Sequence, residues 1–197
     1  MKCLGIDPDL HDTALAILEL NTEAILNGLV SKTQTLPTIL DLTTASISSD
    51  FTGQEAVIKM IIALEHEIST FIGLHSIDLC IIEGQQKYFG TSPARIEDII
   101  QGAHISGAAA AYFIANTRDS ALIIPTPNTW KGSIPKSIHQ ARIINSLGWK
   151  VKKIKSHSYP LNPPEKFQFT SEKWKHIIDA IGLAWWGLKQ SIKVVNS

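Results

Sequence analysis

The segment MKCLGID, residues 1–7, and the turn PDLHDT that follows it, residues 8–13, set the expectations for the whole chain. A short apolar run ends abruptly in the carboxylate of Asp7, and the polar turn leads into a second apolar run at 14–18. This pattern predicts two strands joined by a tight turn. Because burying an unpaired charge is expensive, Asp7 is poorly suited to a core position and well placed to hold a metal ion or transfer a proton. The alternative is that Asp7 only caps the turn.

The composition is that of a folded chain, with 197 residues of which 44% are hydrophobic and 18% charged. This length suits one domain, or one domain with a sizeable insertion, and the charge content argues against disorder. We see neither an apolar run that could span a bilayer nor the pattern of a signal peptide. Cys3 and Cys80 fall in predicted buried strands and are interpreted as core residues. We therefore expect a reducing, cytoplasmic location.

The charges are unevenly distributed along the chain, although the net charge is zero. Residues 1–130 carry 6 Lys or Arg against 15 Asp or Glu, whereas 131–197 carry 12 against 3. This asymmetry suits a metal site in the first part and a polyanion-binding surface in the second. The alternative is that the two parts interleave in space and their charges mix.

Hydrophobic periodicity predicts three strands, then helix, strand, helix, strand, helix, loop and helix. The strands are expected at 2–7, 13–20, 24–30, 76–83 and 121–124, and the helices at 53–72, 94–116, 137–147 and 171–189. We expect 31–52 to be a loop that could contain some strand, and 149–171 shows no clear period. Hairpin strands followed by alternating strands and helices indicate an α/β fold with a mixed sheet.

A second carboxylate, Glu83, also stands where an apolar strand stops. If the two strands are parallel neighbours, Asp7 and Glu83 meet at the end of the sheet where α/β proteins build their sites. On the last helix, His176 and Asp179 share one face, although such a pair alone is usually an ordinary surface feature. Three carboxylates and one imidazole suit Mg²⁺ or Mn²⁺ better than structural zinc. Two such ions can assist phosphodiester hydrolysis.

Taken in order, the motifs resemble those of the RuvC-type Holliday-junction resolvases of the RNase H-like superfamily. GIDPD…DTALAI looks like that family's first strand and turn, CIIEGQQ like the strand that ends in its second carboxylate, and HIIDAIGLA like its final helix. SPARIEDIIQGAHISGAAAAY is similar to its small-residue helix, and IPTPNTWKGSIPKSIHQARII to its basic loop and Lys-x-x-x-Gln helix. The match is that of a divergent member, such as a phage or another mobile element would encode.

The resemblance implies an α/β, RNase H-like fold: a mixed five-stranded sheet, three antiparallel strands then parallel strands, flanked by helices. It implies a single nuclease domain over 1–197, and relative to the family the segments 31–52 and 149–171 look like insertions. By the same resemblance, the ligands of two Mg²⁺ or Mn²⁺ ions are Asp7, Glu83, His176 and Asp179, with Asp7 bridging the ions. Lys131 and Lys136 would then lie beside the scissile phosphate.

The resemblance also implies partners: a homodimer that nicks two opposed strands of a four-way DNA junction. The helix from Gln101 to Ala111 is the expected dimer seam, although core packing alone could explain its small residues. Ala14 departs from the family, which usually has Gly there.

Two further segments are candidates for contact with DNA. The first contains Lys150, Lys152, Lys153 and Lys155, interleaved with aromatic residues; we interpret it as a phosphate-contacting loop, the alternative being a solvated basic loop. The second, Lys87, Tyr88 and Phe89, could stack on unpaired bases or fold back on the core. We expect Trp185 in the core and Trp186 half-exposed, rather than as a stacking platform.

The leading interpretation is a metal-dependent endonuclease that resolves four-way junctions by paired symmetric nicks. Another RNase H-like nuclease, acting on branched DNA, RNA–DNA hybrid or structured RNA, would use the same residues. A non-catalytic nucleic-acid-binding module would not need an acid or His at all four positions. An ASKHA-type phosphotransferase also begins with a Gly-x-Asp hairpin, but its two lobes need a longer chain.

Overall fold

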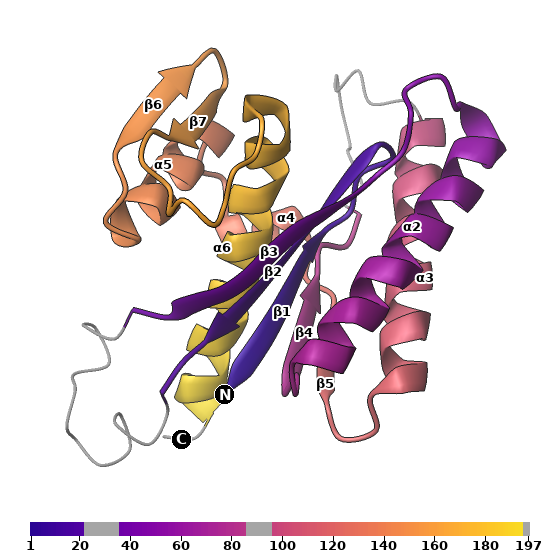
Figure 1. Cartoon of the computed structure of the whole chain (residues 1–197), viewed down its shortest axis with the longest axis horizontal. Helices are drawn as coiled ribbons and strands as arrows, with labels where there is room; N and C mark the ends of the chain where they lie inside the picture. The colour runs from indigo at the N-terminus through magenta and orange to yellow at the C-terminus, as the bar shows by residue number, and fades with distance from the viewer. Residues whose placement is uncertain (22–35, 86–95, 195–197) are drawn as a thin grey trace.

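A five-stranded sheet with helices on both faces organises the computed structural model, which describes residues 1–21, 36–85 and 96–194 (Figure 1). The elements in chain order are β1 (Lys2–Asp7), β2 (Asp12–Glu19), β3 (Thr38–Ser46), α2 (Gly53–Leu74), β4 (Leu79–Ile82), α3 (Ile96–Asn116), β5 (Ala121–Ile123), α4 (Pro127–Lys131), α5 (Lys136–Ser146), β6 (Val151–Ile154), β7 (His157–Pro160) and α6 (Ser171–Val194). The sheet has the order β3-β2-β1-β4-β5, and β6 and β7 form a separate two-stranded sheet.

β1 lies at the centre of the sheet and makes both kinds of strand pairing. It runs antiparallel to β2 and parallel to β4, where Ile6 lies opposite Ile82. β3 continues the antiparallel part and β5 the parallel part. The mixed five-stranded sheet expected from the sequence is therefore confirmed. Since β1 and β4 run in the same direction, the residues at their carboxyl ends lie at the same end of the sheet.

The third strand of the sheet is not where it was expected. It is β3, which lies within the segment 31–52 that we expected to be a loop with room for some strand. The segment 24–30, where we expected this strand, falls outside the described residues. β3 is an edge strand and buries only Leu42 and Ala45, so its sequence lacks a strong apolar signal. Its threonines favour extended backbone and half-buried positions, which explains why it forms a strand.

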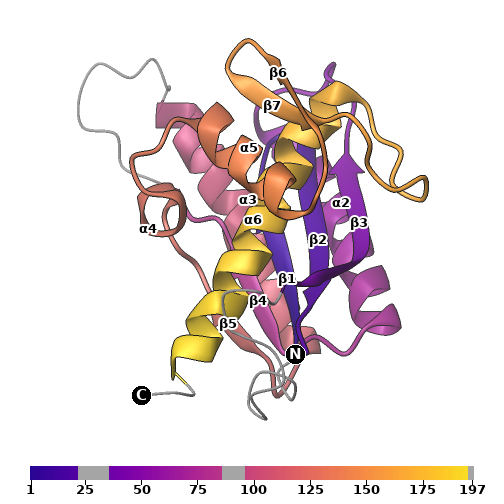
Figure 2. The same ribbon diagram turned by 90° about the vertical axis from the view of Figure 1, so that its left-hand side faces the viewer.

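The segment 149–171, in which we found no period, contains the β6–β7 hairpin. Each strand has four residues, too few to show alternation clearly. The hairpin is anchored through buried Ser158 and Tyr159 of β7, and β6 is mostly exposed. Figure 2 shows that α4, α5 and this hairpin gather along one helix, α6.

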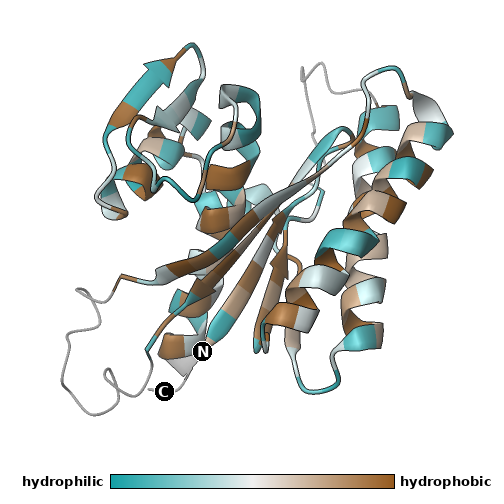
Figure 3. Ribbon diagram, viewed as in Figure 1, coloured by the Kyte–Doolittle hydropathy of each residue, from teal (hydrophilic) through white to brown (hydrophobic). Residues whose placement is uncertain are grey.

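The two faces of the sheet carry separate apolar clusters (Figure 3). Successive residues of a strand point to opposite faces, so Cys3 belongs to the cluster under α6 and Leu4 to the cluster under α2 and α3. Fully buried members under α6 include Ile177, Ile181, Ala184 and Leu188, and those under α2 and α3 include Met60, Ile68, Ile105 and Phe113. Burying each large apolar side chain contributes roughly 1.5–3 kcal/mol. Burial on both faces explains why β1, β2 and β4 are almost continuous apolar runs.

Gly5 allows α6 to lie directly on β1. A Cβ atom at Gly5 would collide with the carbonyl oxygen of Ala180 and lie 2.7 Å from the backbone nitrogen of Ala184. At this point the backbone of α6 packs directly against the backbone of β1, with no side chain between them. This close approach brings the preceding turn of α6, with His176 and Asp179, to the end of β1. Among the described helices, none is long and apolar enough to cross a membrane.

Gly5→Ala should lower the free energy of unfolding by about 1–3 kcal/mol or more, because the colliding atoms belong to helix backbone and cannot move aside. Gly73→Ala is the matched control, since a Cβ at Gly73 meets nothing within 4 Å. That control should be neutral or stabilising by up to about 1 kcal/mol. Urea denaturation of both variants measures the difference. Equal midpoints for the two variants would contradict the close approach of α6 and β1.

Candidate active site

The carboxylates of Asp7 and Glu83 lie side by side at one end of the sheet. Asp7 is the last residue of β1, and Glu83 directly follows β4. The backbone N–H of Glu83 donates to the carbonyl of Ile6 at 3.0 Å, which continues the parallel pairing to the end of both strands. Asp7 is 4% exposed and Asp179, on α6, is 1% exposed. Such burial is costly for ionised groups without partners.

His176 is the partner of Asp7. Its Nδ1–H donates to Asp7 Oδ2 at 3.0 Å, and its Nε2 lies 4.0 Å from Asp9 Oδ2. Although burial disfavours the carboxylate, the hydrogen bond from His176 and the nearby charges of Lys136 and His176 lower the pKa of Asp7. Burial likewise opposes charge on the imidazole, but the hydrogen bond to Asp7 raises the pKa of His176. The pair therefore favours carboxylate and imidazolium together.

Two lysines neutralise the other two carboxylates. Lys136 Nζ lies 2.6 Å from Asp179 Oδ2, and Lys131 Nζ lies 3.2 Å from Glu83 Oε1. The same Glu83 oxygen accepts the indole N–H of Trp130 at 2.8 Å. Burial works against the ammonium of Lys136, but the charges of Asp179 and Asp7 outweigh it and raise its pKa.

Glu83 is the carboxylate of the cluster whose pKa is raised. Burial and the charge of Asp7 raise its pKa to about 7; Lys131 and the hydrogen bond from Trp130 oppose this rise, and Asp179 adds to it. Asp7, Glu83 and Asp179 therefore interact electrostatically as one cluster, although they come from β1, the end of β4 and α6. A cation placed among them would relieve this repulsion.

Buried Gln140 of α5 holds Asp179 in place. Its amide nitrogen donates to Asp179 Oδ1 at 3.3 Å and to the carbonyl of Lys175 at 3.0 Å. Its amide oxygen accepts the backbone N–H of Ser158 at 3.0 Å. One side chain thus joins α5, α6 and β7 at the carboxylate cluster. On the opposite side, Ser106 of α3 donates to the backbone carbonyl of Glu83 at 3.1 Å.

The residues present fit a hard divalent cation in chemistry, although the lysines now hold two of the carboxylates. Among the described residues, no three His, Cys, Asp or Glu side chains are arranged as ready metal ligands. Two of the carboxylates, Glu83 and Asp179, instead form ion pairs with Lys131 and Lys136. Carboxylate oxygens with one imidazole are nevertheless the donors that Mg²⁺ and Mn²⁺ take in proteins.

The other residues singled out from the sequence belong to three further segments. Lys150, Lys152, Lys153 and Lys155 are exposed on and beside the β6–β7 hairpin. Lys87, Tyr88 and Phe89 fall outside the described residues. In the segment from Gln101 to Ala111, one face is buried in the core, whereas Ala103, His104, Gly107 and Ala111 are exposed.

Sequence reasoning missed Trp130, Gln140 and Asp9 as contacts of the cluster. Asp9 lies in the turn after β1, where its Oδ1 accepts the N–H of His11 at 3.1 Å, and its other oxygen lies 4.0 Å from His176 Nε2. Gln140 lies four residues after Lys136, so both point to one face of α5, and this spacing is a signal that could have identified it. For Trp130, only its position next to Lys131 gave a hint.

Comparison with known proteins identifies the fold. No protein-family model matches the chain, and no curated protein sequence matches it. RuvC of Thermus thermophilus in complex with a Holliday junction substrate is structurally similar, with a TM-score of 0.62 and 14% identity over 98% of this chain and 96% of that chain. The structure of Thermus thermophilus RuvC gives a TM-score of 0.61 at 14% identity, over 98% of this chain and 97% of that one. The chain therefore has the RuvC-type RNase H-like fold, which confirms the resemblance at the level of the fold.

Gln140→Met keeps the length of the side chain but removes its hydrogen bonds. It should lower the free energy of unfolding by about 1–3 kcal/mol for each buried group left unsatisfied. Gln54→Met is the control, because Gln54 is exposed at the start of α2 and its replacement should change stability by no more than about 0.5 kcal/mol. Urea denaturation followed by circular dichroism compares the two. A Gln140→Met variant as stable as the control would show that the network contributes nothing.

Proposed function

We propose that the protein is a metal-dependent, structure-selective DNA endonuclease that resolves four-way junctions by paired symmetric nicks. The observation that carries this proposal is the cluster of buried Asp7 and Asp179 with partly buried Glu83, at the end of the parallel strands beside Lys131 and Lys136. Carboxylates with perturbed pKa values gathered at one point are typical of functional sites. The choice of a junction as substrate rests on the shared fold with RuvC, one structure of which is a complex with such a junction.

We infer that Asp7, Glu83, His176 and Asp179 hold two divalent cations, Mg²⁺ or Mn²⁺. When bound, the ions would supply Lewis-acid stabilisation of the phosphoryl group and a more acidic water. His176 orients Asp7 through Nδ1, and its Nε2, on loss of its proton to the incoming cation's charge, would be the nitrogen that serves as a ligand. Trp130 and Lys131 both hold Oε1 of Glu83, which fixes the orientation of that carboxylate.

The two lysines have a role that changes when substrate arrives. In the free protein, Lys131 and Lys136 balance the charge of Glu83 and Asp179. A scissile phosphate beside the cluster offers these ammonium groups a second anion, and cations among the carboxylates would take over the balance there. We propose that both lysines then contact the phosphate or its neighbours and stabilise the charge that develops during cleavage.

We propose that the inserted segment 149–171 contributes a phosphate-contacting surface. Lys152 and Lys153 are exposed on β6, with Lys150 and Lys155 at its two ends. The hairpin is joined to the cluster through Gln140, so contacts made there are positioned relative to the carboxylates. From sequence alone, we add Lys87, Tyr88 and Phe89 as candidate contacts with the branched DNA. The segment 31–52 contributes the edge strand β3, and we assign it no contact.

Paired nicks require two active sites, and we propose that two copies associate through the helix around Gln101 to Ala111. An apolar groove of about 580 Å³ separates α2 and α3 next to Gln101. Ile58, Ile96 and Ile100 line it and are 50%, 77% and 48% exposed. Exposed apolar patches of this kind are typical of interaction surfaces. Unpaired nicks at separate times on the two strands would argue against such a dimer.

A second candidate is another RNase H-like nuclease that acts on RNA–DNA hybrid, structured RNA or other branched DNA. The same carboxylates would serve it, so substrate preference separates the candidates. A panel of labelled four-way junction, flap, fork and hybrid substrates in Mg²⁺ decides between them. Paired nicks on the junction support the first proposal, and cleavage of the hybrid alone would contradict it.

Asp7→Asn should reduce junction cleavage in Mg²⁺ by about 100-fold or more, because it removes a charged ligand that acts mainly in the transition state. Binding of the junction, measured by gel shift without metal, should change little. Asp119→Asn is the control, since Asp119 is exposed beyond the end of α3. Cleavage by Asp7→Asn at a rate close to that of the unmodified protein would contradict the two-ion proposal.

Lys152→Ala should weaken junction binding similarly for all sequences and reduce the salt dependence of the affinity by about one unit of slope. The physical reason is the loss of one phosphate contact and the counterion release that accompanies it. Lys59→Ala is the matched control, because Lys59 lies on α2, on the opposite face of the sheet. Affinities measured between 50 and 200 mM salt, a range over which such contacts typically show, test this. An unchanged slope for Lys152→Ala would remove the hairpin from the DNA surface.

A further inference from the structure

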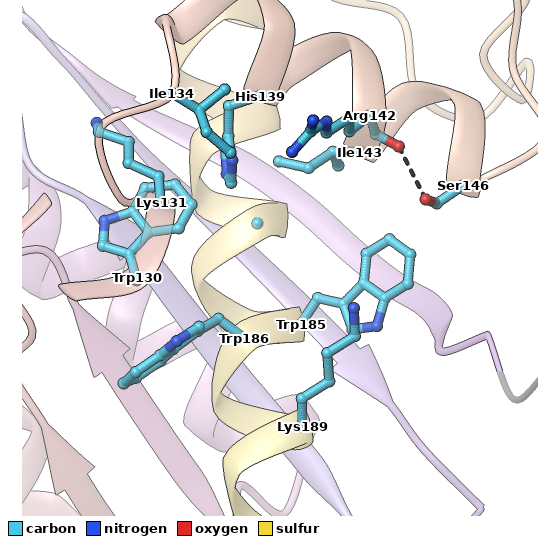
Figure 4. A pocket seen from close by; sticks show the side chains of 11 residues that line it. Trp130, Lys131, Ile134, His139, Arg142, Ile143, Ser146, Trp185, Trp186 and Lys189 are labelled. Atoms are coloured by element: carbon cyan, nitrogen blue, oxygen red, sulfur yellow. Dashed lines mark hydrogen bonds between the residues drawn. The ribbon is translucent and has the colours of Figure 1, made fainter. Parts of the chain in front are cut away.

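A cleft of about 270 Å³ lies between α4, α5 and α6, next to the carboxylate cluster (Figure 4). Three tryptophans and three cations share its lining: Trp130, Trp185, Trp186, Lys131, Arg142 and Lys189. Among the described residues that line it, none is acidic. The cleft therefore combines aromatic surface with positive charge, in a chain whose net charge is zero.

The cleft is built on Gly182 of α6. A Cβ atom at Gly182 would lie 2.6 Å from Ile143 Cδ1 and 2.8 Å from Trp130 Cζ3, so α4 and α5 can reach the helix only because no side chain is present there. The ring of His139 packs edge-on against Trp130, with centroids 4.8 Å apart. These contacts hold the indole of Trp130 in one position, where its N–H reaches Glu83.

Trp185 and Trp186 are both half-buried and pack against the core cluster under α6, so Trp186 is half-exposed as expected and Trp185 lies at the margin of the core rather than inside it. Figure 4 shows their side chains diverging from α6, with Trp186 on the side of Trp130. Lys189 Nζ lies 4.3 Å from the centre of the Trp185 ring and covers that indole. Among the described residues, Trp186 contacts no other aromatic ring and no cation, which leaves it the better surface for stacking.

We propose that this cleft binds one unpaired nucleotide of the DNA substrate, with the base stacked on Trp186 and its phosphate near Arg142. The inference rests on the proposed nuclease function, because it takes DNA as the ligand. Charge complementarity supports it, since the cations of the lining match a phosphodiester. The volume lies just below the roughly 300–1,000 Å³ of small-molecule pockets, which suits one base rather than several.

The cleft adjoins the carboxylate cluster, so a base bound in it would lie near the proposed site of cleavage. Trp130 and Lys131 line the cleft and also contact Glu83, at 2.8 and 3.2 Å. A nucleotide in the cleft would therefore place its strand beside the carboxylates. Fully paired duplex cannot supply such a base without unstacking, which costs free energy. The cleft thus favours DNA in which bases near the cut are already unpaired.

The test uses binding alone, without metal. A fluorescently labelled hexathymidylate and a strand of the same length with abasic sugars at all six positions are titrated with the full-length protein in EDTA, and anisotropy is recorded. Trp186→Ala should bind the intact strand about 5- to 100-fold more weakly and the abasic strand as before, because a base–aromatic stack is lost. Trp186→Phe, which keeps an aromatic face, should retain most of the affinity for the intact strand.

Arg142→Ala should weaken binding of both strands and reduce the salt slope by about one, since it removes a phosphate contact. Arg118→Ala is its matched control, because Arg118 is exposed beyond α3 and is not among the residues that line the cleft. That control should leave both affinities unchanged. Loss of affinity in Arg118→Ala equal to that in Arg142→Ala would mean that binding is diffuse, and would overturn the proposal.

Equal affinity of Trp186→Ala and the unmodified protein for the intact strand would also overturn it. If Trp186→Ala does not fold, Trp186→Leu, which fills volume without an aromatic face, replaces it. The junction assay keeps the two proposals separate. Junction cleavage together with base-independent binding contradicts the cleft alone, whereas base-dependent binding without cleavage of any substrate contradicts the nuclease alone.

Discussion

The neutralisation of three clustered carboxylates is the interaction on which the rest of the structure depends. Asp7 and Asp179 are buried and Glu83 is partly buried beside them, and each has its own cationic or protonated partner. Removing one partner from such a pair leaves a buried charge, which typically costs about 3–5 kcal/mol. The partners come from α4, α5 and α6, elements that follow the sheet in the chain. The site is therefore also the place where the C-terminal elements are fixed to the strands.

Helix α6 makes this arrangement possible because it approaches its neighbours closely at two glycine contacts. Gly5 of β1 allows the helix to lie on the sheet, and Gly182 of the helix itself allows Trp130 and Ile143 to lie on the helix. The first contact brings His176 and Asp179 to the strand ends. The second brings Trp130 to Glu83. Packing and chemistry are coupled here, since a larger residue at either glycine would move a side chain of the site.

The sequence predicted the sheet and the carboxylates better than it predicted their surroundings. Asp7 and Glu83 could be placed because an apolar run that ends in an acid is a local pattern, and parallel pairing then brings the two together. Gln140 could not be assigned its role in this way, because its partners come from α6 and β7. β3 was misplaced because an edge strand needs little apolar surface.

The hydrogen bond from Ser106 to the backbone carbonyl of Glu83 gives α3 a second significance. Ser106 lies on the inner face of this helix, whose outer face carries Gly107 and Ala111. If two copies associate on the outer face, the helix has a neighbouring subunit on one side and Glu83, a proposed metal ligand, on the other. A shift of α3 by a fraction of an ångström would then displace Glu83 through a single bond. The same helix, α3, would then form the proposed dimer contact and position Glu83. The position of the Glu83 carboxylate would in that case differ between a single copy and a dimer.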